Sequence, residues 1–262
     1  MANMTSSVSA SQVAGELASA TFEEIPALVE HYREDPRQQV IKACERALKR
    51  HAKELAERER VNDMYELMHE LGGDGVVVGV DEVGRGSVAG PLTVCAVCLP
   101  MEPRVWGIND SKKLTPARRE LLSVMIAEVA TAIGFCHIAP KDIDEMGMAR
   151  AIRAAVAGAV ADTGLEPDCV LMDGNPLGAV PNERDVVKGD AKIACIAAAS
   201  IMAKVTRDEM MVEYDAEYPE YHLAESKGYA SPEHIEAIRK HGLCPLHRVS
   251  FCGNFLQTER LF

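Results

Sequence analysis

Four acidic residues follow apolar segments that have the character of buried strands. Asp81 and Glu82 close the first such segment, and Asp173 closes the second. Asp190 follows a third, in the sequence KGD. Carboxylates gathered at neighbouring strand ends repel one another unless cations neutralise them, and hard divalent cations prefer such oxygen ligands. Two such ions roughly 4 Å apart activate a water and stabilise the leaving oxygen of a phosphodiester. The four residues therefore predict a two-metal site.

The adjacency of Asp81 and Glu82 sets a geometric condition on this site. Neighbouring strand residues point to opposite faces of a sheet, so the two side chains share one site only if the strand twists or ends there. Gly84 and Gly86 follow at once and favour such a break. Acidic residues at a single strand end are usually solvated, so the prediction depends on all four occurring together.

The turn Gly84-Arg85-Gly86 is the second candidate element. It resembles a dinucleotide-binding fingerprint but does not match it. Three residues instead of two lie between Gly86 and the last glycine, Gly90, and a strand follows instead of a helix. The chain has no GxxxxGK[ST] motif, which excludes a P-loop NTPase. A Gly-Arg-Gly turn beside acidic strand ends suits close approach of the backbone to a sugar-phosphate, with the amides as donors. The alternative is a plain tight turn.

Strands and helices that alternate from Gly75 onward must position these residues. Small residues after Asp190 indicate a long helix packed closely on a sheet, with Asp190 at its N-cap. The pattern predicts an α/β fold, a mixed sheet with helices on both faces. Strands are expected at 76–82, 90–100, 131–140, 169–173 and 184–188, and helices at 116–130, 148–162, after Asp190, and from about Ser231 to His241.

The first 72 residues have a different texture. Apolar residues recur at helical spacing after Asp35-Pro36, which read as an N-cap and a first helical position. Asn62 is expected to cap a short last helix that Gly72-Gly73 stops. We therefore predict a small all-helical domain of about three helices at 1–72 and an α/β domain at 73–262.

Composition bounds the function. The chain has 262 residues and a formal charge of −12, which argues against a protein that coats nucleic acid but allows a local basic groove. The eight cysteines are scattered, and Cys95 and Cys98 in one strand would face opposite sides, so buried thiols are favoured over a metal site. The start has no features of a secretory signal, and no apolar run approaches the roughly 20 residues that span a bilayer. We expect a cytoplasmic protein that does not bind membranes.

Five segments of the α/β region form an ordered set: GVDEVGRG (79–86), NDSKKLTPARR (109–119), VLMDGN (170–175), VVKGDAKIACIAAASIMAKVTRD (186–208) and KGYASPEH (227–234). Together they closely resemble bacterial ribonuclease HII, over about residues 73 to 253. The resemblance implies a ribonuclease H-like fold and two Mg²⁺ or Mn²⁺ ions held by Asp81, Glu82, Asp173 and Asp190. Some members also carry a similar helical N-terminal extension.

The resemblance also implies substrate contacts. The turn Gly84-Arg85-Gly86 would read a ribonucleotide 2′-hydroxyl, and Tyr229 would stack on the deoxynucleotide sugar beyond the junction. Phosphate contacts would come from Lys112 or Lys113, Ser200 and Lys204. From the residues alone, Lys112 and Lys113 could equally be a solvated loop pair, and Lys204 with Asp208 an ordinary surface ion pair.

Two positions depart from the family pattern: Ser87 replaces the usual proline after GRG, and Ser226 replaces the usual histidine before KGY. The GRG turn favours type HII over type HIII, which carries GKG. The implied activity is hydrolysis on the 5′ side of ribonucleotides, in RNA–DNA hybrids and singly embedded in duplex DNA, by a monomer. The alternatives are a non-catalytic nucleic-acid-binding module and another nuclease of the same fold. Retention of all four carboxylates disfavours the first, and GRG with KGY disfavours the second.

Two terminal features suggest partners. Gln257, Leu261 and Phe262 resemble the linear peptides with which bacterial repair proteins bind the sliding clamp, although these residues could instead fold back onto the core. A basic stripe in the helical domain suggests substrate affinity or a partner contact, and its alternative is a solvated face paired with glutamates. The stripe comprises Lys42, Arg46, Lys49, Arg50 and Lys53.

Overall fold

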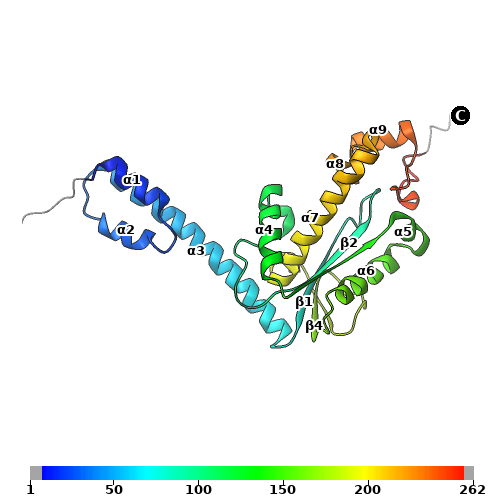
Figure 1. Ribbon diagram of the computed structural model, residues 1–262, viewed down its shortest axis with the longest axis horizontal. Helices are drawn as coiled ribbons and strands as arrows, with labels where there is room; N and C mark the ends of the chain where they lie inside the picture. Colours follow the sequence, from blue (N-terminus) through cyan, green and yellow to red (C-terminus); the bar gives the residue numbers. More distant parts are fainter. Residues whose placement is uncertain (1–7, 257–262) are drawn as a thin grey trace, which may run out of the picture. The chain divides into compact units, whose positions relative to one another are not determined.

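The computed structural model describes residues 8–256. The chain forms two compact units, Met1–Asn62 and Asp63–Phe262, and one long helix contributes to both (Figure 1). The residues Gln257, Leu261 and Phe262, named above for clamp binding, lie outside the described residues.

The first unit contains α1 (Ala10–Ser19), α2 (Ile25–His31) and the first part of α3 (Gln38–Gly72). Ser9 begins α1 with a capping box, because its hydroxyl accepts from the Gln12 amide and the Gln12 side chain accepts from the Ser9 amide. The core of the unit consists of Val13, Leu17, Ile25, Val40, Ala43 and Ala47.

The expected break at Asn62 is wrong, since α3 runs through it without interruption. The next residues explain why: Met64, Tyr65 and Met68 are buried, and the Tyr65 hydroxyl accepts from the Val105 amide at 2.9 Å. Tertiary packing of these side chains outweighs the preference of asparagine for an N-cap position. The helix α1 was not expected from the sequence.

The second unit is built on a five-stranded sheet in the order β3-β2-β1-β4-β5. The pairs β1–β2 and β2–β3 are antiparallel, whereas β1–β4 and β4–β5 are parallel. The mixed sheet predicted from the sequence is confirmed. The strands are β1 (Val77–Val83), β2 (Leu92–Cys98), β3 (Ala132–Ile138), β4 (Cys169–Asp173) and β5 (Glu183–Val186).

Helices cover both faces of this sheet (Figure 1). On one face, Val78 and Val80 share a core with α5 (Pro140–Met146) and α6 (Met148–Asp162). On the other face, α7 (Ala194–Glu217) packs directly on β1, and α4 (Pro116–Val129) packs against α7. The approach is very close at Gly79, where a Cβ would lie 2.3 Å from the Cys195 carbonyl carbon. This contact explains the small residues of α7.

Short elements complete the unit. They are η1 (Ser111–Lys113), η2 (Gly189–Ala191), η3 (Pro219–Tyr221), α8 (Leu223–Ser226), α9 (Pro232–His241) and η4 (Val249–Phe251). The expected helix after Ser231 is confirmed, and the Ser231 hydroxyl caps it. The expectation that Asp190 caps a long helix is wrong, because Asp190 lies in η2 and α7 begins at Ala194. Across residues 8–256, no helix combines the length and apolar character needed to cross a membrane.

Candidate active site

Asp81 and Asp173 occupy equivalent places in the two central parallel strands. The register of β1 and β4 pairs Gly79 with Leu171 and Val80 with Met172, and each aspartate is the next residue of its strand. Both therefore lie on the face that α7 covers, about 4.8 Å apart at the backbone. The pairing of β1 with β4 ends at Val80 and Met172, whereas β1 continues beside β2 to Val83. Asp81 is buried, and Asp173 is half-buried.

Asp190 joins this edge through a turn fixed to β4. The Gly189 amide donates to Asp173 Oδ1 at 2.7 Å, which fastens η2 to the end of the strand. Lys188 takes a left-handed conformation to enter the turn, and Asp190 is buried within it. These local bonds place the third acidic segment of the sequence beside the first two.

Electrostatic coupling shows that the four carboxylates share one region. Burial raises the pKa of Asp81 to about 8, and the charges of Glu82 and Asp173 act in the same direction against a hydrogen bond from Ser200. Burial also raises the pKa of Glu82 and of Asp190, with Asp173 adding repulsion in both cases. The site therefore holds more negative charge than its own residues neutralise.

Two cations offset part of this charge. Lys112 Nζ lies 3.7 Å from Asp190 Oδ2, and Arg85 Nη1 lies 3.5 Å from Glu82 Oε1. Partial burial lowers the pKa of Lys112, but the surrounding carboxylates outweigh burial and raise it overall. The contributing carboxylates are Asp190, Asp110, Asp81 and Asp173.

The donor set fits a hard divalent cation. Four carboxylates supply oxygen ligands, and their mutual repulsion is the condition that such a cation relieves. As the side chains stand within residues 8–256, no three His, Cys, Asp or Glu groups are close enough to bind one ion together. Side-chain rotation is therefore required to gather the carboxylates around a metal.

The fold requires only the first of the two glycines in the Gly84-Arg85-Gly86 turn. Gly84 has φ +85°, and a Cβ there would lie 2.3 Å from Arg207 Nε, so the fold requires a glycine. Gly86 has no positive φ, and a Cβ there would meet nothing within 4 Å. The fold does not require a glycine at 86, and its exposed backbone is free to be approached closely.

The segment that carries Tyr229 is joined to the same turn region. The Gly228 carbonyl accepts from the amides of Val88 and Ala89, at 2.8 and 3.1 Å. Lys227 and Gly228 both have positive φ, and the Tyr229 side chain is 40% exposed. The structure thus brings the GRG and KGY segments together with an aromatic ring at the surface.

The residues named for phosphate contacts lie in three different environments. Lys112 and Lys113 are both exposed on η1, and the Lys112 ammonium lies beside Asp190. Ser200 is buried on α7, with its hydroxyl 2.9 Å from that of Ser111, so it fastens η1 to α7 and does not face solvent. Lys204 Nζ bonds Asp208 Oδ1 at 2.6 Å, the ion pair considered as the alternative from the sequence.

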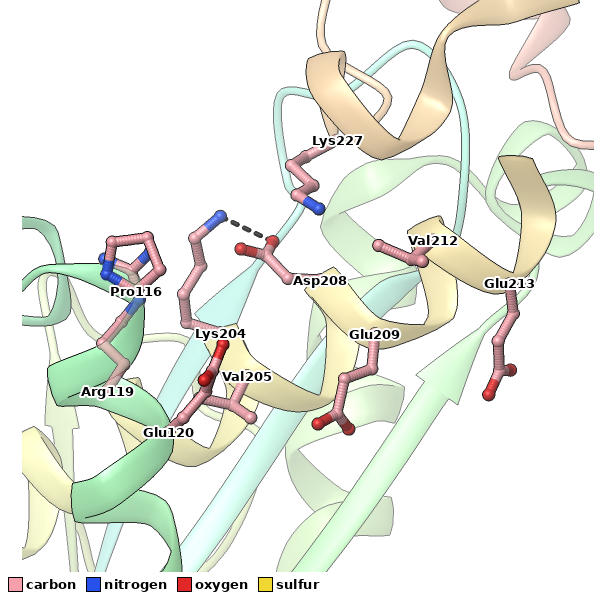
Figure 2. Close-up of a pocket in the computed structure, with 10 residues that line it drawn as sticks. All are labelled: Pro116, Arg119, Glu120, Lys204, Val205, Asp208, Glu209, Val212, Glu213 and Lys227. Carbon is pink, nitrogen blue, oxygen red and sulfur yellow. Dashed lines mark hydrogen bonds and ion pairs between the residues drawn. The ribbon is translucent and has the colours of Figure 1, made fainter. Parts of the chain in front are cut away.

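A groove of about 570 Å³ runs along α7 from Lys204 (Figure 2). Figure 2 shows the side chains of Lys204 and Lys227 on either side of Asp208. The groove lies one helical turn from Ser200 and is not lined by the four carboxylates. Its lining comprises Pro116, Arg119, Glu120, Lys204, Val205, Asp208, Glu209, Val212, Glu213 and Lys227.

Sequence reasoning missed four buried polar residues beside the turns: Arg207, His234, His247 and Arg248. One signal was available for Arg207, which continues the helical face of Ser200, Ala203 and Met211, all of them buried. An arginine on such a face indicates a buried cation with internal acceptors. No comparable pattern marks the other three.

Two known protein-family models match this chain. The family model described as Ribonuclease HII matches residues 78–254, and the model described as Ribonuclease HII N-terminal domain matches residues 9–71. Ribonuclease HII of Moorella thermoacetica is 47% identical over 198 residues, which cover 74% of this chain and 96% of that protein. Ribonuclease HII of Ruminiclostridium cellulolyticum is 44% identical over 204 residues, covering 77% of this chain and 80% of the relative.

Solved structures show the same fold. The ribonuclease H2 of Pyrococcus horikoshii OT3 superposes with a TM-score of 0.59 at 27% identity, covering 70% of this chain and 99% of that chain. A ribonuclease HIII crystallised with Mn²⁺ superposes with a TM-score of 0.53 at 18% identity, covering 70% of this chain and 68% of that chain, and shows the fold alone. The expected ribonuclease H-like architecture is confirmed.

Proposed function

This chain belongs to the ribonuclease HII family and is thus an endoribonuclease of the ribonuclease H type, and we propose that it cuts on the 5′ side of ribonucleotides. Its substrates would be RNA–DNA hybrids and DNA duplexes with single embedded ribonucleotides, and its products would carry 3′-hydroxyl and 5′-phosphate ends. Removal of ribonucleotides from DNA is the corresponding biological use. The observation that carries the proposal is Gly86, an exposed glycine that the fold does not need, two positions after Gly84 and four after Glu82.

Asp81, Glu82, Asp173 and Asp190 would hold two Mg²⁺ or Mn²⁺ ions. When bound, such ions lower the pKa of water and stabilise the charge on the leaving 3′-oxygen. The protein contributes the placement of the ligands: Asp173 is fixed by the Gly189 amide, and Asp81 is held in the sheet between β2 and β4. Lys112, whose ammonium lies beside Asp190, would keep part of the negative charge balanced when the ions are absent.

The Gly84-Arg85-Gly86 turn would bind the ribose. An exposed Gly86 lets the sugar approach the main chain, and backbone amides donate well to a 2′-oxygen. Tyr229 supports the same assignment, because its ring is exposed on a segment bonded to Val88 and Ala89, directly after the turn. A ring in that place would stack on the sugar of the neighbouring deoxynucleotide. Lys112, Lys113 and Lys204 would contact phosphates, whereas buried Ser200 would support the site through its bonds to Asp81 and Ser111.

The N-terminal helical domain, proposed to extend to Gly72, would support substrate affinity. Lys42, Lys49 and Lys53 lie on α3 and would supply the charge. Arg50, by contrast, donates hydrogen bonds to the carbonyls of Leu17, Ala18 and Ala20 within the domain. Deletion of residues 1–62 tests this role without removing Met64, Tyr65 and Met68, which are buried in the second unit. The cut position should stay the same while the KM for the duplex rises. A shifted cut would contradict the assignment.

The direct test of the activity is a duplex with one ribonucleotide, incubated with Mg²⁺, with Mn²⁺ or with a chelator. The proposal predicts a single cut on the 5′ side of the ribonucleotide in either metal and none with the chelator. Cleavage on the 3′ side, or cleavage of the all-DNA duplex at the same rate, would contradict it.

A further inference from the structure

Arg207 links the two turns that are proposed to contact substrate. Its side chain is fully buried, and its Nη1 donates to the Lys227 carbonyl at 2.8 Å. Its Nη2 donates to Ser87 Oγ at 2.9 Å, and that hydroxyl in turn donates to the Gly84 carbonyl at 2.8 Å. The guanidinium carbon also lies 5.8 Å from the centre of the Tyr229 ring. One cation therefore contacts the KGY segment twice, at the Lys227 carbonyl and at the Tyr229 ring, and reaches the GRG turn through Ser87.

Arg248 holds the same turn from another direction. It is also fully buried, and its Nη1 donates to the Arg85 carbonyl at 3.2 Å. Its Nε and Nη2 both donate to the Gly90 carbonyl, at 3.2 and 2.9 Å. Among residues 8–256 no carboxylate forms a salt bridge with either guanidinium. Burial of two cations that bond carbonyls and a hydroxyl carries a desolvation cost. Packing alone does not explain why both arginines are present.

The consequence for the turn follows from peptide geometry. In a trans peptide the C=O of one residue and the N–H of the next point in opposite directions. The Gly84 carbonyl faces Ser87, so the Arg85 amide faces away from it. The Arg85 carbonyl faces Arg248, so the Gly86 amide faces away from that guanidinium. Neither amide has an acceptor among the described residues, and both lie on exposed residues.

We propose that Arg207 and Arg248 are positioning residues that orient the Gly84–Ser87 turn so that the amides of Arg85 and Gly86 donate to the ribose. The inference rests on the proposed function of the turn. Arginine is needed because its planar fork bonds several carbonyls at once, whereas a lysine ammonium has a different donor geometry. Ser87 takes part in this positioning, because its hydroxyl accepts from Arg207 and donates to the Gly84 carbonyl. The proline usual in the family has no hydroxyl and could not make this link.

The test compares recognition of ribose with recognition of duplex. Arg207→Lys, Arg248→Lys and Ser87→Ala are assayed with a single-ribonucleotide duplex for kcat and KM, and with the all-DNA duplex as a competitive inhibitor for Ki. Matched controls are Arg153→Lys, which also bonds a carbonyl, and Ser123→Ala, which loses a bond to the carbonyl three residues earlier, both away from the turns. Thermal melting confirms that each variant is folded.

The inference predicts that the KM of the two arginine variants rises about tenfold, and that of Ser87→Ala about threefold, with Ki unchanged in all of them. The controls should keep wild-type values. Folded variants with wild-type KM would overturn the positioning role, and if the lysine variants do not fold, an unchanged KM for Ser87→Ala would overturn it. A wild-type enzyme whose KM equals the Ki of the all-DNA duplex would instead overturn the proposed function of the turn, and the inference with it.

Discussion

His234 and His247 lie 3.1 Å apart, Nε2 to Nε2, with both rings buried. The Cys244 amide donates to His247 Nδ1 at 3.0 Å, so the proton of a neutral His247 is on Nε2 and points at His234. His234 then carries its own proton on Nδ1 and donates to the Tyr229 carbonyl at 2.9 Å. The chain of bonds is satisfied only when both imidazoles are neutral, and it ends on the residue proposed to stack against the substrate.

The stability of the protein should therefore fall in mild acid. Burial, followed by the charge of His234, lowers the pKa of His247 to about 4, and burial lowers that of His234. The unfolded chain binds more protons than the folded one below about pH 6.5, so this contribution is complete above that pH and is lost as the pH falls toward 4. The loss between pH 7 and pH 5 should be about 2 kcal/mol for His247 alone.

Denaturant unfolding of the wild type and of His247→Gln at several pH values measures this contribution. The difference between the two proteins should shrink as the pH falls, because the variant has no imidazole to protonate. His241→Gln, an exposed histidine of α9, is the control and should keep the wild-type slope. Parallel slopes for the wild type and His247→Gln would contradict the neutral pair.

Alanine substitutions should separate the roles of the two turn glycines. Gly84→Ala should reduce the free energy of unfolding by about 1–3 kcal/mol, because it forces a positive φ and a clash with Arg207. Gly86→Ala should melt like the wild type but raise the KM for a single-ribonucleotide duplex about tenfold, because the methyl group meets the substrate and not the protein. The result that contradicts this account is an unchanged KM for Gly86→Ala.

Divalent ions should stabilise the protein through the buried carboxylates. Bound Mg²⁺ would relieve the repulsion among Asp81, Glu82 and Asp173, so the Tm should rise on addition of Mg²⁺ and fall with a chelator, by an amount equivalent to about 1–3 kcal/mol. Asp81→Asn should melt higher than the wild type without metal and respond less to Mg²⁺. Asp162→Asn, whose carboxylate accepts from the Phe135 amide elsewhere, should respond like the wild type. Equal responses of all three would argue against metal binding at Asp81.

Tyr229→Ala should impair cleavage at a single embedded ribonucleotide more than cleavage of a long hybrid. The deoxynucleotide sugar that the ring would stack on occurs only at the junction, and the loss should stay within the roughly 1–3 kcal/mol that aromatic stacking on a base contributes. Tyr229→Phe keeps the ring and should retain activity on both substrates. Equal losses on the two substrates, or a loss of thermal stability alone, would mean that Tyr229 packs in the fold and does not read the junction.

Local periodicity was enough to place β1 and β4, which carry Asp81, Glu82 and Asp173. The predicted bounds of α6 and β4 agree with the structure, because both segments have an uninterrupted pattern between clear breakers. Asp190 was misplaced at a helix cap because a left-handed Lys188 and the bond from Gly189 to Asp173 insert the η2 turn before α7. Such a turn depends on a contact sixteen residues away, which no local pattern encodes.

The supporting residues of the site could not be predicted in the same way. Arg207 bonds Pro91, 116 residues away, and Arg248 bonds Arg85, 163 residues away. Their roles exist only after the sheet has brought these segments together. By contrast, the proximity of Asp81 and Asp173 follows from the register of two adjacent parallel strands, and the acidic residue that closes each apolar segment of the sequence indicates it.

Single-turnover cleavage by Asp173→Asn tests the four-carboxylate centre most directly. The asparagine keeps an oxygen for the Gly189 amide, so the fold should persist while the residue proposed as a metal ligand loses its charge. The control is Asp168→Asn, which changes the other end of β4, where the carboxylate accepts from the Val76 amide. We predict that Asp173→Asn reduces the cleavage rate at a single ribonucleotide at least about a hundredfold and that Asp168→Asn leaves it near wild type. A folded Asp173→Asn protein that cleaves at the rate of Asp168→Asn would contradict the assignment of this centre.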